Sequence, residues 1–234
     1  MITPRPSILP SLALVALLAA GIALAAAPAA HADTAADHLA TFFVGRLAFG
    51  GNEGGDCGDV GQDLVKLVAR ASTIHVQEER KLKLSDDGLY ETPFLFMNGH
   101  NDFTLSAAEL ANLRKYLEHG GFVFASGCCT NPEFPAAWRR ELSRVFPGEK
   151  VQKIPYDHLL YRAFYKLDHI RSAHGNRDIY LEGLFHQGDL VAVIGEDGLC
   201  CSFSMGNSCN VGKGVAPEDA KKIAVNISVY ALTH

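Results

Sequence analysis

The middle of the chain constrains the fold most, because it encodes a strand, a helix and a second strand in close succession. Phe94 to Met97 and Phe122 to Ala125 are continuous apolar runs of the kind that form buried strands. Between them, Ser106 and Glu109 have the spacing of a capping box, which predicts a helix over 106–119. Two strands joined by such a crossover helix lie parallel, in a right-handed arrangement. The segment therefore predicts a parallel βαβ unit.

The same alternation continues on both sides of this unit. Repeated alternation of strands and helices is typical of an α/β domain, so we expect a three-layer sandwich in which helices cover both faces of a mostly parallel sheet. The charged segment Glu78 to Lys83 is expected to be a solvated stretch. Further strands are predicted at 42–49, 73–76 and 190–194, and further helices at 62–71, from Pro135 to Pro147, and at 217–232.

The first residues have the pattern of a secretory signal peptide. Arg5 precedes an apolar stretch from Ile8 to Ala27, and Ala30-His31-Ala32 resembles a cleavage site. The stretch is also long enough for a membrane anchor if it is not cleaved. We expect residues 1–32 to be removed and the protein to be periplasmic or secreted. The remainder predicts one α/β domain over 40–234, because no linker or repeat divides it.

The composition narrows the expected partners. The chain carries 21 Lys and Arg against 26 Asp and Glu, so it lacks the basic character that nucleic-acid binding requires. We expect a small molecule or an envelope protein as partner, and the membrane only if the leader is kept. Six cysteines in an exported chain first suggest disulfides, because compartments outside the cytoplasm are oxidising.

Cysteines and a histidine follow the predicted strands. In a parallel sheet the carboxyl ends of the strands share one edge, where the binding sites of α/β proteins collect. We therefore expect residues that are far apart in the sequence to converge there. They are Cys57 in the glycine-rich loop after the first strand, His100, Cys128, Cys129, Cys200, Cys201 and, in the loop GNSCNVGKG, Cys209.

The leading interpretation of these residues is a metal site. Thiolates and imidazole suit Zn²⁺ or another transition metal, such as copper or iron. His100 or His158 would supply a nitrogen ligand, and Asp102 or Asp157 could hold the second ring nitrogen of that histidine. His158 also lies in an aromatic stretch typical of a loop packed over the core. The cysteine spacing matches no zinc-ribbon motif, so the hypothesis depends on convergence in space.

Two other interpretations remain open. Disulfides would link the cysteines at 128–129 to those at 200–201, because adjacent cysteines rarely pair with each other, and the chain would be a stapled interaction module of the envelope. Alternatively, a cysteine is the nucleophile of a hydrolase or amidotransferase-like enzyme, with His100 as its base. Against this, the residues around Cys128 lack the second glycine of a nucleophile elbow.

Several segments, in order along the chain, resemble one bacterial family. They are FFVGRLAFGG, PFLFMNGHNDFTLSAAELANLRKYLEHGGFVFAS, FPAAWRRELSRVFP, IPYDHLLYRAFY and AVNISVYAL, which together run over nearly all of the expected mature chain. They look like the family called domain of unknown function 4159 (DUF 4159). The resemblance implies a flavodoxin-like fold similar to that of class I glutamine amidotransferases, and it implies no established activity.

The cysteines depart from the pattern of that family. Many members look as though they carry an acidic pair where this chain has Ser126 to Cys129, and the later cysteine-rich loop appears in a subset. No G-x-C-x-G elbow with a downstream His-x-Glu is present, so the resemblance confers no glutaminase triad. We therefore expect the cysteines to carry a chemistry of their own, with metal binding as the leading hypothesis.

Overall fold

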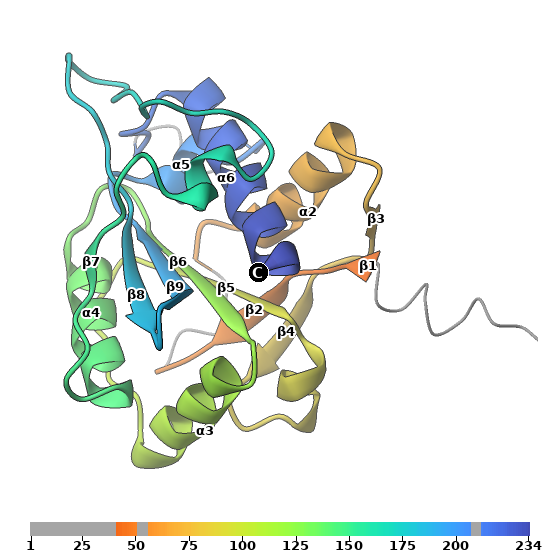
Figure 1. The fold of residues 1–234 in the computed structure, drawn as a ribbon, viewed down its shortest axis with the longest axis vertical. Coiled ribbons are helices and arrows are strands. Elements are labelled where there is room, and N and C mark those ends of the chain that lie inside the picture. The colour runs from red at the N-terminus through yellow and green to blue at the C-terminus, as the bar shows by residue number, and fades with distance from the viewer. Residues whose placement is uncertain (1–40, 51–55, 207–211) are drawn as a thin grey trace, which may run out of the picture.

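The computed structural model describes residues 41–50, 56–206 and 212–234. Within these ranges the chain forms a central sheet with helices packed on both of its faces (Figure 1). The predicted leader at 1–32, most of the glycine-rich loop and Cys209 lie outside the described residues. What the sequence predicts for them stays a prediction.

Seven strands of the described ranges form the main sheet. They are β2 (Gly45–Ala48), β4 (Arg80–Lys83), β5 (Phe94–Gly99), β6 (Phe122–Gly127), β7 (Gln152–Lys153), β8 (Glu182–His186) and β9 (Asp189–Gly195). Their order is β4-β2-β5-β6-β9-β8-β7. The first five in this order are parallel, whereas β8 pairs antiparallel with β9 and β7 antiparallel with β8. The predicted α/β class with a mostly parallel sheet is confirmed, and the antiparallel extension was missed.

The amino-terminal part of the described chain differs from the prediction in two ways. The strand predicted over 42–49 is split, because β1 (Thr41–Phe42) pairs with β3 (His75–Val76) in a separate two-stranded sheet and only β2 joins the main sheet. The segment predicted to be solvated, Glu78 to Lys83, contains the edge strand β4, in which Leu82 is buried and its neighbours are exposed. Charges on an edge strand oppose pairing with other chains.

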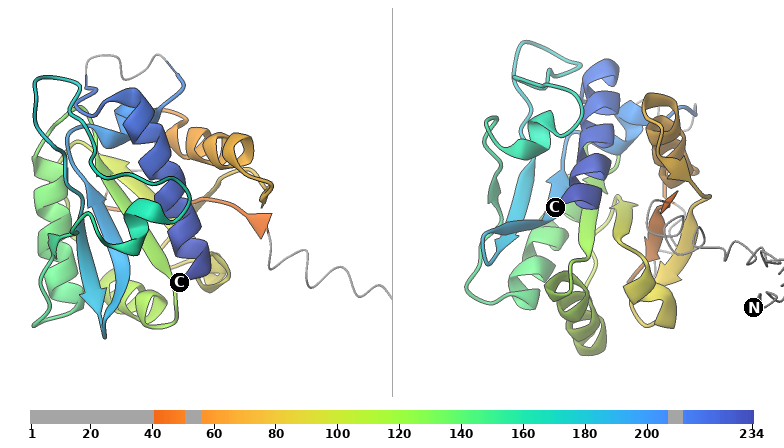
Figure 2. Two further views of the ribbon diagram at one scale, coloured as in Figure 1. Left: turned by 45° about the horizontal axis from the view of Figure 1, so that its top comes forward. Right: turned by 45° about the vertical axis from the view of Figure 1, so that its right-hand side comes forward.

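Helices on the two faces give three layers (Figure 2). One face is covered by α2 (Val60–Ala71), α5 (Leu199–Phe203) and α6 (Pro217–Thr233), and the other by α3 (Ala107–Glu118) and α4 (Glu133–Val145). Two 3-10 helices, η1 (Asp87–Glu91) and η2 (Leu159–Arg162), lie in connections. Among the helices of the described ranges, none has the length and apolar character that crossing a bilayer requires.

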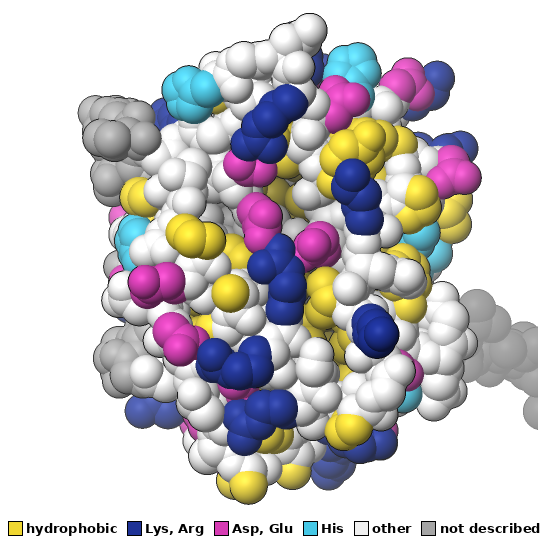
Figure 3. All heavy atoms as spheres, turned by 90° about the vertical axis from the view of Figure 1, so that its left-hand side faces the viewer, with side chains coloured by type: hydrophobic (Ala, Val, Ile, Leu, Met, Phe, Trp, Pro, Cys, Tyr) yellow, Lys and Arg dark blue, Asp and Glu magenta, His cyan; other side chains and the backbone are white. Residues whose placement is uncertain are grey.

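Alternation along the strands separates the two halves of the core. Phe94 and Phe96 of β5 pack with α2 and α6, whereas Leu95 and Met97 pack with α3 and α4. A strand that is buried on both faces must be apolar throughout, which explains the continuous apolar runs in the sequence. On the face shown in Figure 3, acidic and basic side chains are interspersed rather than gathered by sign.

The βαβ unit predicted from the middle of the chain is confirmed. β5 and β6 pair in parallel as far as Gly99 opposite Gly127. The helix between them begins with the predicted capping box, in which Ser106 Oγ accepts from the backbone N–H of Glu109 and the Glu109 carboxylate accepts from the backbone N–H of Ser106. After the helix, Gly120 has a φ of 86°, in the left-handed region that favours glycine.

The strand order creates a reversal point at one edge of the sheet. β2, the first strand of the main sheet along the chain, has β4 on one side and β5 on the other. The chain therefore extends the sheet first in one direction and then in the other, and the connections diverge at the carboxyl ends of β2 and β5. A crevice forms at such a reversal point, and open α/β sheets bind their ligands there.

The capping box gives a direct test of the described fold. Replacing Ser106 with Ala removes the acceptor for the Glu109 N–H and should lower the free energy of unfolding by about 1 kcal/mol. Denaturant titration followed by circular dichroism measures the change. Ser143→Ala is the matched control, because Ser143 is an exposed residue inside α4 and its replacement should change stability by less than about 0.5 kcal/mol. Equal losses in the two variants would contradict the assigned helix start.

Candidate metal centre

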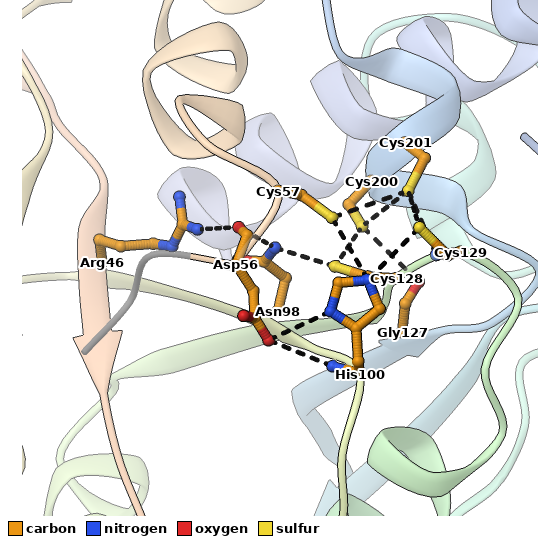
Figure 4. Close-up of polar contacts among 10 residues, drawn as sticks. All are labelled: Arg46, Asp56, Cys57, Asn98, His100, Gly127, Cys128, Cys129, Cys200 and Cys201. Carbon is orange, nitrogen blue, oxygen red and sulfur yellow. Dashed lines mark hydrogen bonds and ion pairs between the residues drawn. The ribbon is translucent and has the colours of Figure 1, made fainter. Parts of the chain in front are cut away.

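Five cysteines and one histidine meet at the carboxyl edge of the parallel strands (Figure 4). Each comes from a segment that follows a different strand: Cys57 lies between β2 and α2, His100 directly after β5, Cys128 and Cys129 directly after β6, and Cys200 and Cys201 in α5 after β9. We call these six residues the cysteine cluster. The convergence predicted from the sequence is therefore present for every member that the described ranges include.

The backbone at two cluster members is held in an uncommon conformation. Cys57 has a φ of 56° and Cys129 a φ of 53°, both in the left-handed region, and Thr130 continues it with a φ of 58°. For residues other than glycine this region costs about 1–2 kcal/mol per residue. Strained backbone of this kind gathers at functional sites, where surrounding structure holds it in place.

One part of the cluster is a buried set of four sulfurs. The Sγ atoms of Cys57, Cys128, Cys200 and Cys201 all lie within 4.8 Å of one another. The Cys128 to Cys200 distance is 3.4 Å, and Cys201 Sγ lies 4.0 Å from both Cys200 Sγ and Cys57 Sγ. Except for Cys57, these residues have no exposed surface. A tetrahedral ion with metal–sulfur bonds of about 2.3 Å separates its sulfurs by about 3.8 Å, so the set has the size of one such site.

The remaining part of the cluster faces solvent. His100 Nε2 lies 3.3 Å from Cys129 Sγ and 3.9 Å from Cys57 Sγ, and these three ligand atoms are again within 4.8 Å of one another. The side chain of His100 is 33% exposed. Cys129 Sγ also lies 3.9 Å from Cys201 Sγ, so the two parts of the cluster are continuous.

Polar groups around the cluster fix its members. The Asp56 carboxylate lies 3.4 Å from His100 Nδ1 and accepts the backbone N–H of His100 at 3.2 Å. Asn98 donates through Nδ2 to Cys128 Sγ at 3.0 Å and to the backbone oxygen of Asp56 at 2.8 Å. The buried Arg46 donates to the same oxygen at 2.8 Å. Asp56 therefore joins the loop that carries Cys57 to β2 and to β5, the strand that leads to His100.

The position of α5 is set by the neighbouring strand. The backbone N–H of Cys200 donates to Ser126 Oγ of β6 at 3.0 Å, and Ser202 Oγ accepts the backbone N–H of Val215 at 3.2 Å. Gly212 passes so close to Cys129 that a Cβ on it would lie 2.3 Å from the Cys129 Cα. A residue without a side chain is required at this point, which explains one glycine of the GNSCNVGKG loop.

The cysteine thiols of the cluster differ in the direction in which their pKa values are shifted. The pKa of Cys201 lies below its usual range, because neighbouring thiols and the backbone N–H of Cys129 hydrogen-bond to its sulfur and outweigh the effect of burial. Burial raises the pKa of Cys200 well above its usual range. Burial, with the charge of Cys201, raises the pKa of Cys129 to about 11. Burial therefore opposes the ionisation of Cys200 and Cys129, and a bound cation would favour it.

Asp102, predicted to support the histidine, does not do so. It lies 2.8 Å from Arg140 Nη1 in an ion pair, and its side chain is 63% exposed. Asp56 takes the predicted role beside His100. The adjacent position of Asp56 and Cys57 was the only sequence signal for it, and Asn98 had none beyond its place at the end of a strand.

His158 and Asp157 lie away from the cluster, contrary to the prediction. The ring of His158 packs 5.5 Å from that of Tyr230, which in turn lies 6.0 Å from Phe122 at the start of β6. The cluster lies at the opposite end of that strand. Burial lowers the pKa of His158, as expected for a histidine packed in an aromatic environment. The alternative reading of His158, as part of a packed loop, is therefore the correct one.

The five described cysteines form no disulfide with one another. Even the closest pair, Cys128 and Cys200, has its sulfurs 3.4 Å apart, well beyond the about 2 Å of a covalent bond. The predicted staple between the two cysteine dipeptides is thus absent from the described residues, although the dipeptides do lie together. The cluster contains six ligand atoms, whereas one disulfide uses only two sulfurs.

Alkylation of Cys129 distinguishes a resting thiol from an activated nucleophile. Because the pKa of Cys129 is raised to about 11, the thiol is protonated at neutral pH, and only the small thiolate fraction reacts. In reduced, metal-free protein, the rate of its reaction with iodoacetamide should rise about tenfold per pH unit between about pH 7 and 10. Pulse alkylation with peptide mass mapping measures this rate, and the buried Cys128 serves as the unlabelled control. A fast, pH-independent reaction would indicate an activated nucleophile instead.

Comparison with known proteins places the chain in a family. A family model described as "Domain of unknown function (DUF4159)" matches residues 47–232. The match extends from within β2 into α6 and includes every member of the cysteine cluster. No match is found among curated proteins. The family model covers well over half of the chain, so the chain belongs to the DUF4159 family.

Proposed function

We propose that this chain is an exported protein that binds a transition metal ion through its cysteine cluster. The observation that carries the proposal is the buried set of Cys57, Cys128, Cys200 and Cys201, whose sulfurs all lie within 4.8 Å of one another. Thiols packed this closely are unfavourable to ionise without a cation, and a metal ion removes that penalty. The four side chains come from three separate segments, so the bound ion would also fasten those segments together.

The nature of the ligands favours Zn²⁺ as the ion of the buried set. Four thiolates in a tetrahedron form a closed structural zinc site. Copper(I) and iron also accept thiolates, so the ligand type alone does not decide between them. An iron–sulfur cluster is less suitable, because its inorganic sulfides separate the cysteine ligands farther than the distances within this set.

The strand order supports the flavodoxin-like assignment of the fold. Numbered along the chain, the parallel strands β2, β4, β5, β6 and β9 lie in the order 2-1-3-4-5, which is the order of flavodoxin-like sheets. The ligand site of such sheets lies where the order reverses. Cys57 and His100 follow the two strands on either side of that point, β2 and β5.

Export is supported by the signal-peptide pattern of residues 1–32. Outside the cytoplasm, free thiols are prone to oxidation, and a bound metal would protect them. Cell fractionation and the mass of the amino-terminal peptide test this part of the proposal. A mature chain that begins at Asp33 supports it, and a cytoplasmic chain that keeps its first residues contradicts it.

A cysteine-dependent enzyme is the second candidate. The observation that favours it is the alignment of Cys129, His100 and Asp56, with 3.3 Å from Sγ to Nε2 and 3.4 Å from Nδ1 to the carboxylate. This is the geometry of a nucleophile, a base and a group that orients the base. The raised pKa of Cys129 opposes it, and it leaves the buried sulfurs without a role. A disulfide-stapled module without catalysis is the remaining alternative.

Metal binding should depend on the buried sulfurs. Reduced full-length protein should bind Zn²⁺, and free Zn²⁺ at about 100 times its dissociation constant should add about 2.7 kcal/mol of stability. That corresponds to a rise in Tm of roughly 5–10 °C. The variant Cys128→Ser with Cys200→Ser should lose the ion of the buried set and the rise in Tm that this ion produces. Elemental analysis, calorimetry and circular dichroism measure metal content, Tm and folding. Wild type with no metal and no free thiols would support disulfides.

Asn98, which hydrogen-bonds to Cys128, should affect the affinity of the cluster for metal. Asn98→Ala removes the N–H donor to Cys128 Sγ, and loss of such a partner typically weakens metal binding by about 10- to 100-fold. Competition with a chromophoric zinc chelator measures the change. Asn112→Ala is the matched control, because the Asn112 side chain donates to the backbone oxygen of Leu84, away from the cluster. Equal affinities of the two variants would show that Asn98 plays no part in holding the ligands.

A further inference from the structure

We infer that the cysteine cluster holds two metal ions, which share the thiolate of Cys57. The inference builds on the proposed metal binding and adds a second ion with a distinct set of ligands. Cys57 belongs to both groups of mutually close ligand atoms: the buried one with Cys128, Cys200 and Cys201, and the half-exposed one with His100 and Cys129. A thiolate has enough lone pairs to bridge two ions.

A single ion leaves part of the cluster unexplained. A tetrahedral ion takes four ligands, and the buried set supplies all four. His100 and Cys129 would then remain beside the site with their ligand atoms 3.3 Å apart. Cys201 Sγ lies 4.0 Å from Cys57 Sγ and 3.9 Å from Cys129 Sγ, so the sulfurs form one continuous group rather than two separate sites. Two ions joined by a shared sulfur use every member.

His100 is arranged as a metal ligand. The Asp56 carboxylate lies beside Nδ1, at 3.4 Å, and Nε2 points toward the sulfurs of Cys57 and Cys129 (Figure 4). A carboxylate that accepts one ring N–H fixes the tautomer and leaves the other nitrogen free to bind a metal, which is the usual arrangement of metal-binding histidines. The backbone of Asp56 is in turn held by Asn98.

The charge of the cluster favours two divalent ions. The five described cysteines would carry five negative charges as thiolates. One divalent ion leaves three of these charges uncompensated, whereas two divalent ions leave one. Three of the five cysteines have no exposed surface, and burying uncompensated charge is costly. Two monovalent ions would also leave three charges, so the balance points to Zn²⁺-like ions rather than to copper(I).

The two ions would differ in their access to solvent. The buried set provides four protein ligands and a closed site. The half-exposed set provides three, and the 33% exposure of His100 leaves a fourth position open to water or a small ligand. Three protein ligands with an open position are typical of catalytic and exchangeable zinc sites. The inner ion would therefore be structural, and the outer ion would exchange or bind a further molecule.

Metal stoichiometry tests the inference. Reduced full-length protein is loaded with Zn²⁺ alone, freed of excess metal and measured by native mass spectrometry. We expect two ions in the wild type and one in both His100→Gln and Cys129→Ser. His158→Gln is the matched control and should keep two, because His158 packs against Tyr230 at the far end of the sheet. The single ion retained by the two cluster variants shows that they fold.

Cobalt provides a second measurement that needs no variant. Two Co²⁺ ions joined by a thiolate couple magnetically, so the wild type with two Co²⁺ should give a weaker paramagnetic signal per ion than protein loaded with one. Chelator should also remove one ion at least about tenfold faster than the other, because only one site is open.

The outcomes separate this inference from the proposed function. One Zn²⁺ in the wild type, unaffected by His100→Gln, overturns the second ion and leaves metal binding intact. Two ions that persist in both cluster variants, or two Co²⁺ without coupling, overturn the shared Cys57 site. No bound metal at all refutes the proposed function itself. If a variant loses both ions, the cobalt coupling in the wild type decides.

Discussion

The level register of the parallel strands is the constraint on which the site depends. Gly99 of β5 lies opposite Gly127 of β6, and Ser126 of β6 lies opposite Gly195 of β9. Three strands therefore end at the same height, and the backbone N–H of Cys128 donates to the oxygen of Gly99 at 2.9 Å just beyond them. Because the ends are level, the residues that follow can meet although they come from distant parts of the sequence.

Two energetic costs destabilise the cysteine cluster. Left-handed backbone at Cys57 and Cys129 is strained, and three sulfurs lie where water does not reach them. Hydrogen bonds from Asn98 to Cys128 and from the backbone N–H of Cys129 to Cys201 offset only part of this, since each reaches one sulfur. In the proposed sites, bound cations would compensate both the crowding and the charge of these sulfurs.

The sequence was sufficient for the parallel strands β5, β6 and β9 and for the ligands that directly follow β5 and β6. Its apolar runs located β5, β6 and β9, and the residues after those runs included His100 and Cys128. It was insufficient where position depends on the path of a long connection. His158 lies in the connection between α4 and β8, whose course leads to the start of the strands rather than to their ends. Asp56 acts through a turn geometry that no periodicity reveals.

The position of Cys129 shows how neighbours determine chemistry on a shared scaffold. A residue in left-handed conformation just after a parallel strand, with a histidine and a carboxylate in line, occupies the place of a nucleophile in many α/β enzymes. Such a nucleophile requires a lowered pKa or a base that takes its proton. Here burial, together with the thiol of Cys201 3.9 Å away, raises the pKa of Cys129, which opposes nucleophilic attack. A cation would be attracted to the same group of sulfurs, so the arrangement that weakens a nucleophile favours a metal ligand.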